Sequence, residues 1–233
     1  MAGAVPVDHW YFLSGIDVLA AVGGAAVMLG DSLTDGRGST TNGNDRWPDQ
    51  LFTRLRSRPD GAGIAIVNQG VGGTRVLRDG LGPAAAARLD RDVLAVSGAR
   101  WLVVFEGVND IGTADATEAA QKQIAADLIA AYEQIITRSR AQGIRVYGAT
   151  LTPFGGNEPY DDPAGYREAA RRAVNRWIRD GRRFDAVFDF DRAVRDPRSA
   201  RRLMTAADCG DHLHLNPAGY RALADAVPAR LFG

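Results

Sequence analysis

Short apolar runs alternate along the chain with longer segments that have an amphipathic helical spacing. The apolar runs lie at residues 25–29, 64–67, 101–105, 145–150 and 186–190. Segments with one apolar face lie between and after them, at residues 48–58, 84–97, 117–141, 163–180 and 217–231. Strands that alternate with helices are typical of βαβ units, which build a parallel sheet through right-handed crossovers. The pattern therefore predicts an α/β fold, with a five-stranded parallel sheet covered by helices on both faces.

A single domain is expected for the whole chain, residues 1–233. This length suits one ordinary globular domain with a sizeable core. No internal repeat, heptad array or low-complexity tract divides the sequence. Residues 1–24 precede the first predicted strand, and we expect them to form an N-terminal extension that packs on the domain.

Charge and hydropathy exclude several classes of partner. The formal net charge is zero and the isoelectric point is about 6.8, so no excess of positive charge favours nucleic acid. The longest weakly polar run, residues 18–30, is shorter than the roughly 20 residues that span a bilayer, and we expect no membrane anchor. No Lys or Arg precedes that run, so it does not resemble a signal peptide. The chain as given is expected to be cytoplasmic, with a secreted longer parent left open.

Metal and cofactor chemistry are not expected. Cys209 is the single cysteine and cannot form an intrachain disulfide. Asp211, His212 and His214 could begin a metal site, but no further cluster of Cys or His supplies the ligands that zinc requires. The glycine-rich segment 68–73 follows the second strand, whereas a dinucleotide-binding loop follows the first.

Polar clusters follow the first three strands and precede the last helix. They are Gly-Asp-Ser-Leu at 30–33, Asn-Gln-Gly-Val-Gly-Gly at 68–73, Gly-Val-Asn-Asp at 107–110 and Asp-His-Leu-His at 211–214. Because ligands bind at the carboxyl ends of parallel strands, we expect these clusters to converge. Each cluster alone is also typical of an ordinary turn or helix cap. Together they supply a hydroxyl nucleophile, a base with an orienting acid, and amide donors, which are the parts of an acyl-transfer site.

The four clusters resemble the conserved blocks of the SGNH or GDSL-type serine hydrolase family, with Ser32, Gly72, Asn109 and His214 at the named positions. The resemblance runs from about residue 25 to the carboxyl end. It implies a flavodoxin-like three-layer α/β/α sandwich. Segments 36–41, 46–48 and 152–156 look most like the arylesterase and acylhydrolase branch of that family.

The resemblance also implies a role for each site residue. Ser32 is the expected nucleophile, and the family spacing of Asp, two residues, then His selects Asp211 and His214 as its partners. The backbone N–H groups of Ser32 and Gly72 and the side-chain amide of Asn109 are the expected oxyanion hole. Asp31 and Asp110 are expected to hold neighbouring turns through backbone amides, outside the catalytic set.

The expected function is cleavage of carboxylic esters through an acyl-serine intermediate. Substrates are expected to be small-molecule or carbohydrate esters with short-chain acyl, aryl or acetylated-carbohydrate groups, and Trp47, Phe154 and His212 are candidate substrate contacts. Three alternatives stay open: an acyltransferase that uses the same acyl-serine, a catalytically silent carbohydrate-binding domain, and a flavodoxin-like cofactor binder, since fold alone does not define function. The sequence alone does not indicate whether the protein is a monomer or an oligomer.

Overall fold

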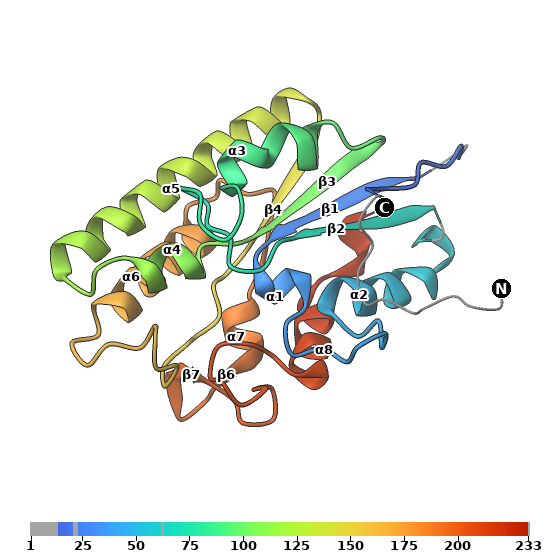
Figure 1. Ribbon diagram of the computed structural model, residues 1–233. Coiled ribbons are helices and arrows are strands. Elements are labelled where there is room, and N and C mark those ends of the chain that lie inside the picture. Colours follow the sequence, from blue (N-terminus) through green and yellow to red (C-terminus); the bar gives the residue numbers. More distant parts are fainter. Residues whose placement is uncertain (1–13, 21–22, 62, 233) are drawn as a thin grey trace, which may run out of the picture.

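Five parallel strands form the central sheet in the order β2-β1-β3-β4-β5 (Figure 1). The computed structural model describes residues 14–20, 23–61 and 63–232, so most of the expected N-terminal extension lies outside the described residues. The strands are β1 (Gly24–Gly30), β2 (Ile64–Gly70), β3 (Ala99–Phe105), β4 (Arg145–Ala149) and β5 (Ala186–Phe188). All five lie where the apolar runs predicted them, and the predicted parallel sheet is confirmed.

Helices cover both faces of this sheet (Figure 1). On one face lie α3 (Ala85–Leu89), α5 (Glu118–Ala141) and α6 (Tyr166–Asp180), and on the other lie α2 (Trp47–Arg56) and α8 (Pro217–Ala226). The arrangement confirms the three-layer α/β/α sandwich. None of the helices in the described part of the chain is both long and apolar enough to cross a lipid bilayer.

Several short elements differ from the sequence expectation. They are α1 (Ser32–Asp35), α4 (Val108–Thr113), α7 (Phe190–Val194), the hairpin of β6 (Arg195–Asp196) and β7 (Ser199–Leu203), and the turns η1 (Pro59–Gly61), η2 (Asp90–Leu94) and η3 (Ala229–Phe232). The strand expected at 186–190 ends at Phe188, because the side chain of Asp189 accepts a hydrogen bond from the Arg192 N–H at 3.2 Å and begins α7. Helices this short follow from local caps rather than from hydrophobic periodicity.

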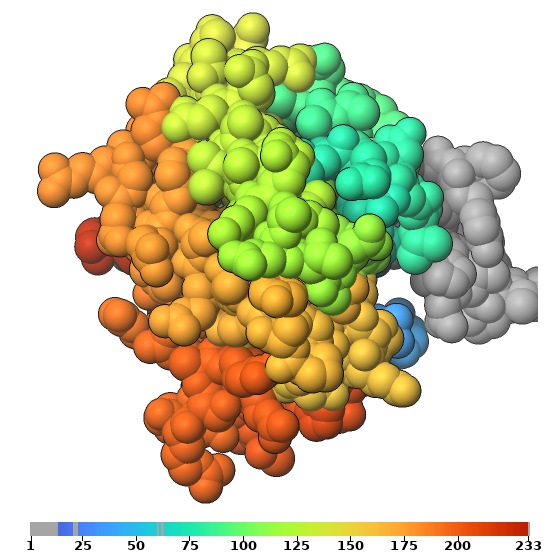
Figure 2. All heavy atoms as spheres, turned by 90° about the vertical axis from the view of Figure 1, so that its left-hand side faces the viewer, coloured from blue at the N-terminus to red at the C-terminus, as the bar shows by residue number. Residues whose placement is uncertain are grey.

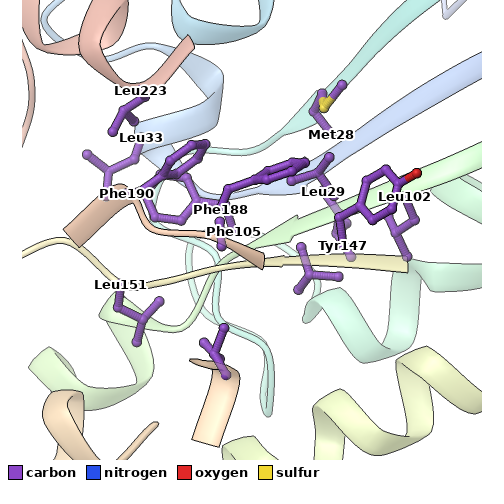
Figure 3. Close-up of a cluster of buried hydrophobic side chains, with 14 of the residues drawn as sticks. Met28, Leu29, Leu33, Leu102, Phe105, Tyr147, Leu151, Phe188, Phe190 and Leu223 are labelled. Atoms are coloured by element: carbon purple, nitrogen blue, oxygen red, sulfur yellow. The ribbon is translucent and has the colours of Figure 1, made fainter. Parts of the chain in front are cut away.

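A cluster of aromatic side chains supports the carboxyl edge of the sheet. Phe190 packs edge-to-face on Phe105, with ring centroids 5.0 Å apart, and on Trp47 at 5.3 Å. All three side chains are buried. Leu33, the residue after Ser32, points toward this cluster (Figure 3). The end of β3 and the turn after β1 therefore rest on one shared apolar support.

We predict that Phe190→Ala destabilises the protein by about 3–5 kcal/mol, the usual cost of deleting a buried aromatic ring and leaving a cavity. Phe52, which is 39% exposed on α2, provides the matched control, and Phe52→Ala is expected to cost less than about 1 kcal/mol. Urea unfolding followed by circular dichroism measures both. Equal decreases in the free energy of unfolding for the two variants would show that the aromatic cluster at Phe190 is not a principal source of stability.

Candidate active site

The four polar clusters converge on one pocket at the carboxyl edge of the sheet. Its volume is about 650 Å³, and its lining includes Ser32, Gly72, Asn109, Asp211 and His214. The segment 152–165 that forms another wall lies between the start of α5 and the β6–β7 hairpin (Figure 2). Hydrogen bonds fix it on both sides, because Arg167 of the next helix donates to the Pro159 carbonyl at 3.0 Å and to the Ala114 carbonyl at 2.9 Å, and the Gly155 N–H donates to the Arg201 carbonyl at 2.7 Å.

Ser32 begins α1 directly after β1, in a turn that requires close packing. Asp31 caps this turn, since its carboxylate accepts from the Leu33 N–H at 2.9 Å. A Cβ atom on Gly30 would lie 2.2 Å from Oγ1 of Thr34, so only glycine permits this approach of backbone to side chain. The turn leaves Ser32 at the pocket with 8% of its surface exposed.

A continuous chain of hydrogen bonds connects Ser32 to Asp211 through His214. Oγ of Ser32 lies 2.8 Å from Nε2 of His214, and Nδ1 of the same ring lies 2.6 Å from Oδ2 of Asp211. Oδ1 of Asp211 accepts from the N–H groups of Leu213 at 3.0 Å and His214 at 2.8 Å. Because Nδ1 faces a carboxylate, it carries the ring proton, and Nε2 is left to accept a proton from Ser32.

The electrostatic environment favours a neutral imidazole beside an ionised carboxylate. Burial raises the pKa of Asp211, but the backbone N–H of His214, its ring and the Leu213 N–H outweigh burial and hold that pKa well below its usual range. Burial lowers the pKa of His214 below the ordinary histidine value, and the nearby Asp211 only partly opposes this shift. A general base must be unprotonated at the working pH, and this pair meets that requirement at neutral pH.

Asn109 lines the pocket, and its amide makes two hydrogen bonds among the described residues. Its Nδ2 donates to the Thr74 carbonyl at 2.8 Å, and its Oδ1 accepts from the Tyr160 hydroxyl at 2.7 Å. These two bonds fix the orientation of the amide and occupy one of its two N–H groups. Gly72 lies on the same wall, where a Cβ atom would be 4.0 Å from Cβ of Ser32. The three residues expected to form the oxyanion hole therefore line the same pocket.

His212 also lines the pocket, but it belongs to a separate pair. Nδ1 of His212 lies 2.6 Å from Oδ2 of Asp208, and its backbone N–H donates to Oδ1 of the same residue at 3.0 Å. The backbone of His212 has φ +64°, in the left-handed region that favours glycine or asparagine. The Ser32 hydroxyl bonds to His214, whereas the ring of His212 bonds to Asp208.

Trp47 and Phe154 are not where the sequence analysis placed them. Both were candidate substrate contacts, but Trp47 is fully buried, Phe154 is 2% exposed, and neither lines the pocket. Nε1 of Trp47 donates to Oγ1 of Thr34 at 3.3 Å, while Phe154 packs edge-to-face behind Tyr160. Burying a large aromatic ring in the core removes much apolar surface from water. The rings of Trp47 and Phe154 therefore pack inward, although their loops lie near the pocket.

The carboxylates of Asp31 and Asp110 have the structural roles expected of them. Asp110 accepts from the N–H groups of Val76 at 2.8 Å and Leu77 at 3.0 Å, while Asp31 caps α1. Burial raises the pKa of Asp31 to about 7. These bonds hold the turns on either side of the pocket and leave both side chains away from its lining.

Several pocket residues lie outside the four motif clusters. They are Asp35, Arg37, Asn157, Glu158 and Tyr160. Among the described residues, Asp208, Cys209 and Asp211 place possible metal-ligand atoms within 4.8 Å of one another. The two carboxylates of that group already bond to different imidazoles, so His212 and His214 do not converge on a shared ion.

The chain belongs to the GDSL-like lipase/acylhydrolase family, whose model matches residues 28–222. It is therefore classed as a carboxylic ester hydrolase. None of the curated protein sequences matches it.

Solved structures share its fold at low sequence identity. A G-D-S-L family protein from Desulfitobacterium hafniense DCB-2 has 17% identity and TM-score 0.64, covering 89% of this chain and 98% of its own. Axe2, an acetylxylan esterase from Geobacillus stearothermophilus, has 23% identity and TM-score 0.62, with coverages of 88% and 92%. LAE5, an alpha/beta hydrolase enzyme from the metagenome of Lake Arreo in Spain, has 20% identity and TM-score 0.62, with coverages of 89% and 94%.

We predict that the ring of His214 titrates below the ordinary histidine pKa of about 6.5, because burial disfavours its charged form. Nuclear magnetic resonance of the imidazole nitrogens between pH 4 and 8, with His214→Asn to assign the signal, measures the midpoint. A midpoint above the ordinary value would show that the attraction of Asp211 outweighs burial.

Proposed function

We propose that this protein is a serine ester hydrolase in which Ser32 is the nucleophile, His214 is the general base and Asp211 orients and stabilises His214. The observation that carries the proposal is the unbroken hydrogen-bond chain from Asp211 through His214 to Ser32. A serine hydroxyl is a weak nucleophile at neutral pH, and a base within hydrogen-bond reach is what activates it. Family membership supports the same reaction class.

The reaction proceeds in two acyl-transfer steps. Oγ of Ser32 attacks the ester carbonyl carbon while its proton passes to Nε2 of His214, which gives a tetrahedral oxyanion. That oxyanion is stabilised by the N–H groups of Ser32 and Gly72 and the side-chain amide of Asn109. The C–O bond to the alcohol breaks as His214 returns the proton to the departing alkoxide. His214 then takes a proton from water, which attacks the acyl-serine and releases the acid and Ser32.

Charged side chains around the pocket support a short acyl group on a polar alcohol. They include Asp35, Arg37 and Glu158, which lie among apolar lining atoms. The aliphatic side chains of the pocket are few, chiefly Leu81 and Leu213. A long acyl chain would need a continuous apolar wall, because each buried methylene contributes about 0.8 kcal/mol only when it leaves water. Acetylated carbohydrates suit this surface, in keeping with the acetylxylan esterase of similar fold.

His212 is proposed to bind the alcohol part of the substrate. Asp208 holds Nδ1 of its ring, so Nε2 is free to accept a hydrogen bond from a sugar hydroxyl. The left-handed backbone of His212 costs on the order of 1 kcal/mol, and the two bonds from Asp208 compensate for it. A residue held in a costly backbone conformation beside the pocket supports a role in recognition.

We predict that Ser32→Ala and His214→Ala each lower kcat for p-nitrophenyl acetate by roughly 10³-fold or more, because triad members act as a unit. His212→Ala is the matched control, since the nitrophenol leaving group has no aliphatic hydroxyl for His212 to bind. Its kcat is expected to stay within about threefold of wild type. Folding of each variant is checked by circular dichroism. Ser32→Ala with near-wild-type turnover, or His212→Ala as the dead variant, would contradict the assignment.

We also predict selective effects on carbohydrate esters. His212→Ala and Asp208→Asn should raise KM for acetylated xylooligosaccharides by about tenfold, the equivalent of about 1.4 kcal/mol for one lost hydrogen bond. Selectivity for the alcohol part is measured by initial rates on these substrates and on phenyl acetate. Selectivity for the acyl group is measured by initial rates on p-nitrophenyl esters of rising chain length. Equal losses on all substrates would contradict the proposed role of His212, and faster turnover of long-chain esters would contradict the short acyl site.

Added alcohol separates hydrolysis from acyl transfer, because a transferase forms mainly the new ester.

A further inference from the structure

One buried guanidinium on α3 bonds to the ends of three neighbouring strands. Nη2 of Arg88 donates to the Gly30 carbonyl of β1 at 3.0 Å and to Oε2 of Glu106, directly after β3, at 3.2 Å. Nη1 donates to the Gln69 carbonyl of β2 at 2.7 Å and to Asp92 at 3.0 Å. The Arg88 residue is only 2% exposed. The side chain therefore belongs to the interior, beneath the carboxyl edge of the sheet.

Each of these three strand ends leads directly to one proposed oxyanion donor. Gly30 lies two residues before Ser32, Gln69 three residues before Gly72, and Glu106 three residues before Asn109. Arg88 itself does not line the pocket. It contacts the backbone or side chain that precedes each donor, and no reacting group.

Glu106 extends this network to the donor Asn109. Oε1 of Glu106 lies 2.7 Å from Oγ1 of Thr74, whose hydroxyl also lies 2.7 Å from the Val71 carbonyl. The carbonyl of Thr74 in turn accepts from Nδ2 of Asn109 at 2.8 Å. Arg88, Glu106, Thr74 and Asn109 therefore form one linked set of bonds across the floor of the pocket.

Burial favours the neutral form of Glu106 in this network. A hydroxyl has one proton to donate, so if Thr74 donates to the Val71 carbonyl, Glu106 must donate to Thr74. Burial raises the pKa of Glu106 to about 8, against the lowering effect of Arg88, which agrees with a protonated side chain at neutral pH. Asp92 then balances the charge of Arg88, with Nη1–Oδ2 at 3.0 Å. Asp31 and Asp110, the other carboxyl groups near Glu106, disfavour its ionised form.

We propose that Arg88 and Glu106 are positioning residues that set the relative placement of the three oxyanion donors. The inference rests on the proposed function, because it concerns the transition state of that reaction. Donors on three separate strands must meet one oxygen with little tolerance, and misplacement by about 1 Å can cost roughly 10²-fold in rate. A planar guanidinium offers five N–H donors in a fixed fork, whereas the lysine ammonium has three donors on a flexible stem and cannot reproduce the four bonds of Arg88.

The first test compares two buried arginines of the same chain. Arg171 is also 2% exposed, and it bonds to Asp191 at 2.7 Å and to the carbonyls of Leu151 at 2.9 Å and Ala200 at 3.1 Å. None of these partners leads to an oxyanion donor. Arg88→Lys and Arg171→Lys should therefore lower Tm similarly, while only Arg88→Lys should lower kcat for p-nitrophenyl acetate.

We predict a kcat loss of about 10- to 100-fold for Arg88→Lys, with KM within about threefold of wild type. The inhibition constant of an alkylboronic acid, which forms a tetrahedral adduct with the serine, should rise in parallel with the loss of kcat. Arg171→Lys should leave kcat and the boronic acid affinity within about threefold of wild type. Equal kcat values for the two variants, or a loss expressed in KM alone, would overturn the inference.

Glu106 supplies a second test that does not depend on Arg88→Lys folding. Glutamine reproduces the neutral acid, since its amide can donate to Thr74 and its carbonyl can accept from Arg88. Glu106→Gln should therefore keep kcat within about threefold, whereas Glu106→Ala should lose about tenfold or more at unchanged KM. Wild-type turnover in Glu106→Ala would overturn the inference. Wild-type turnover in Ser32→Ala would instead overturn the proposed function, so the two failures are distinguishable.

Discussion

The hydrogen bond between the Ser32 hydroxyl and Nε2 of His214 joins residues 182 positions apart, and the rest of the site depends on it. It forms only if the last helix docks beside the turn after the first strand. The Tyr220 hydroxyl of α8 fastens that contact by donating to the Arg37 carbonyl at 2.6 Å, and Gln50 of α2 donates to the Pro217 carbonyl at 3.1 Å. The proposed catalytic pair is therefore a product of the whole tertiary fold.

Buried polar groups beneath the pocket explain how the site keeps its geometry. A buried charge is costly unless it is paired and hydrogen-bonded, and the two Nη groups of Arg88 bond to two carbonyls and two carboxyl groups, while its buried Nε has no partner among the described residues. The same low-dielectric setting raises the pKa of Glu106 and Asp31 through burial. Fixed dipoles in such surroundings stabilise developing charge without having to reorient, which is the main requirement of an oxyanion site.

The sequence predicted the sheet and the four clusters because both follow from local patterns. Apolar runs locate the strands, and the carboxyl edge of a parallel sheet brings Ser32 and His214 together. The sequence could not separate core from pocket for Trp47, because an aromatic ring in a loop has the same pattern in either place. The sequence also did not predict that Arg88 is buried beneath the pocket, because a lone arginine on an amphipathic segment is typical of a solvated face. Long-range packing, rather than periodicity, decides both positions.

The central claim is that His214 activates the Ser32 hydroxyl, and covalent labelling tests this most directly. An activated serine attacks an alkyl sulfonyl fluoride, displacing fluoride and forming a stable sulfonate ester, as it would attack an ester carbonyl. Intact mass and peptide mapping should find one adduct on Ser32 of the wild-type protein, and labelling should be lost in Ser32→Ala and strongly slowed in His214→Ala. Labelling of His214→Ala at the wild-type rate, or an adduct confined to Cys209, would contradict the account.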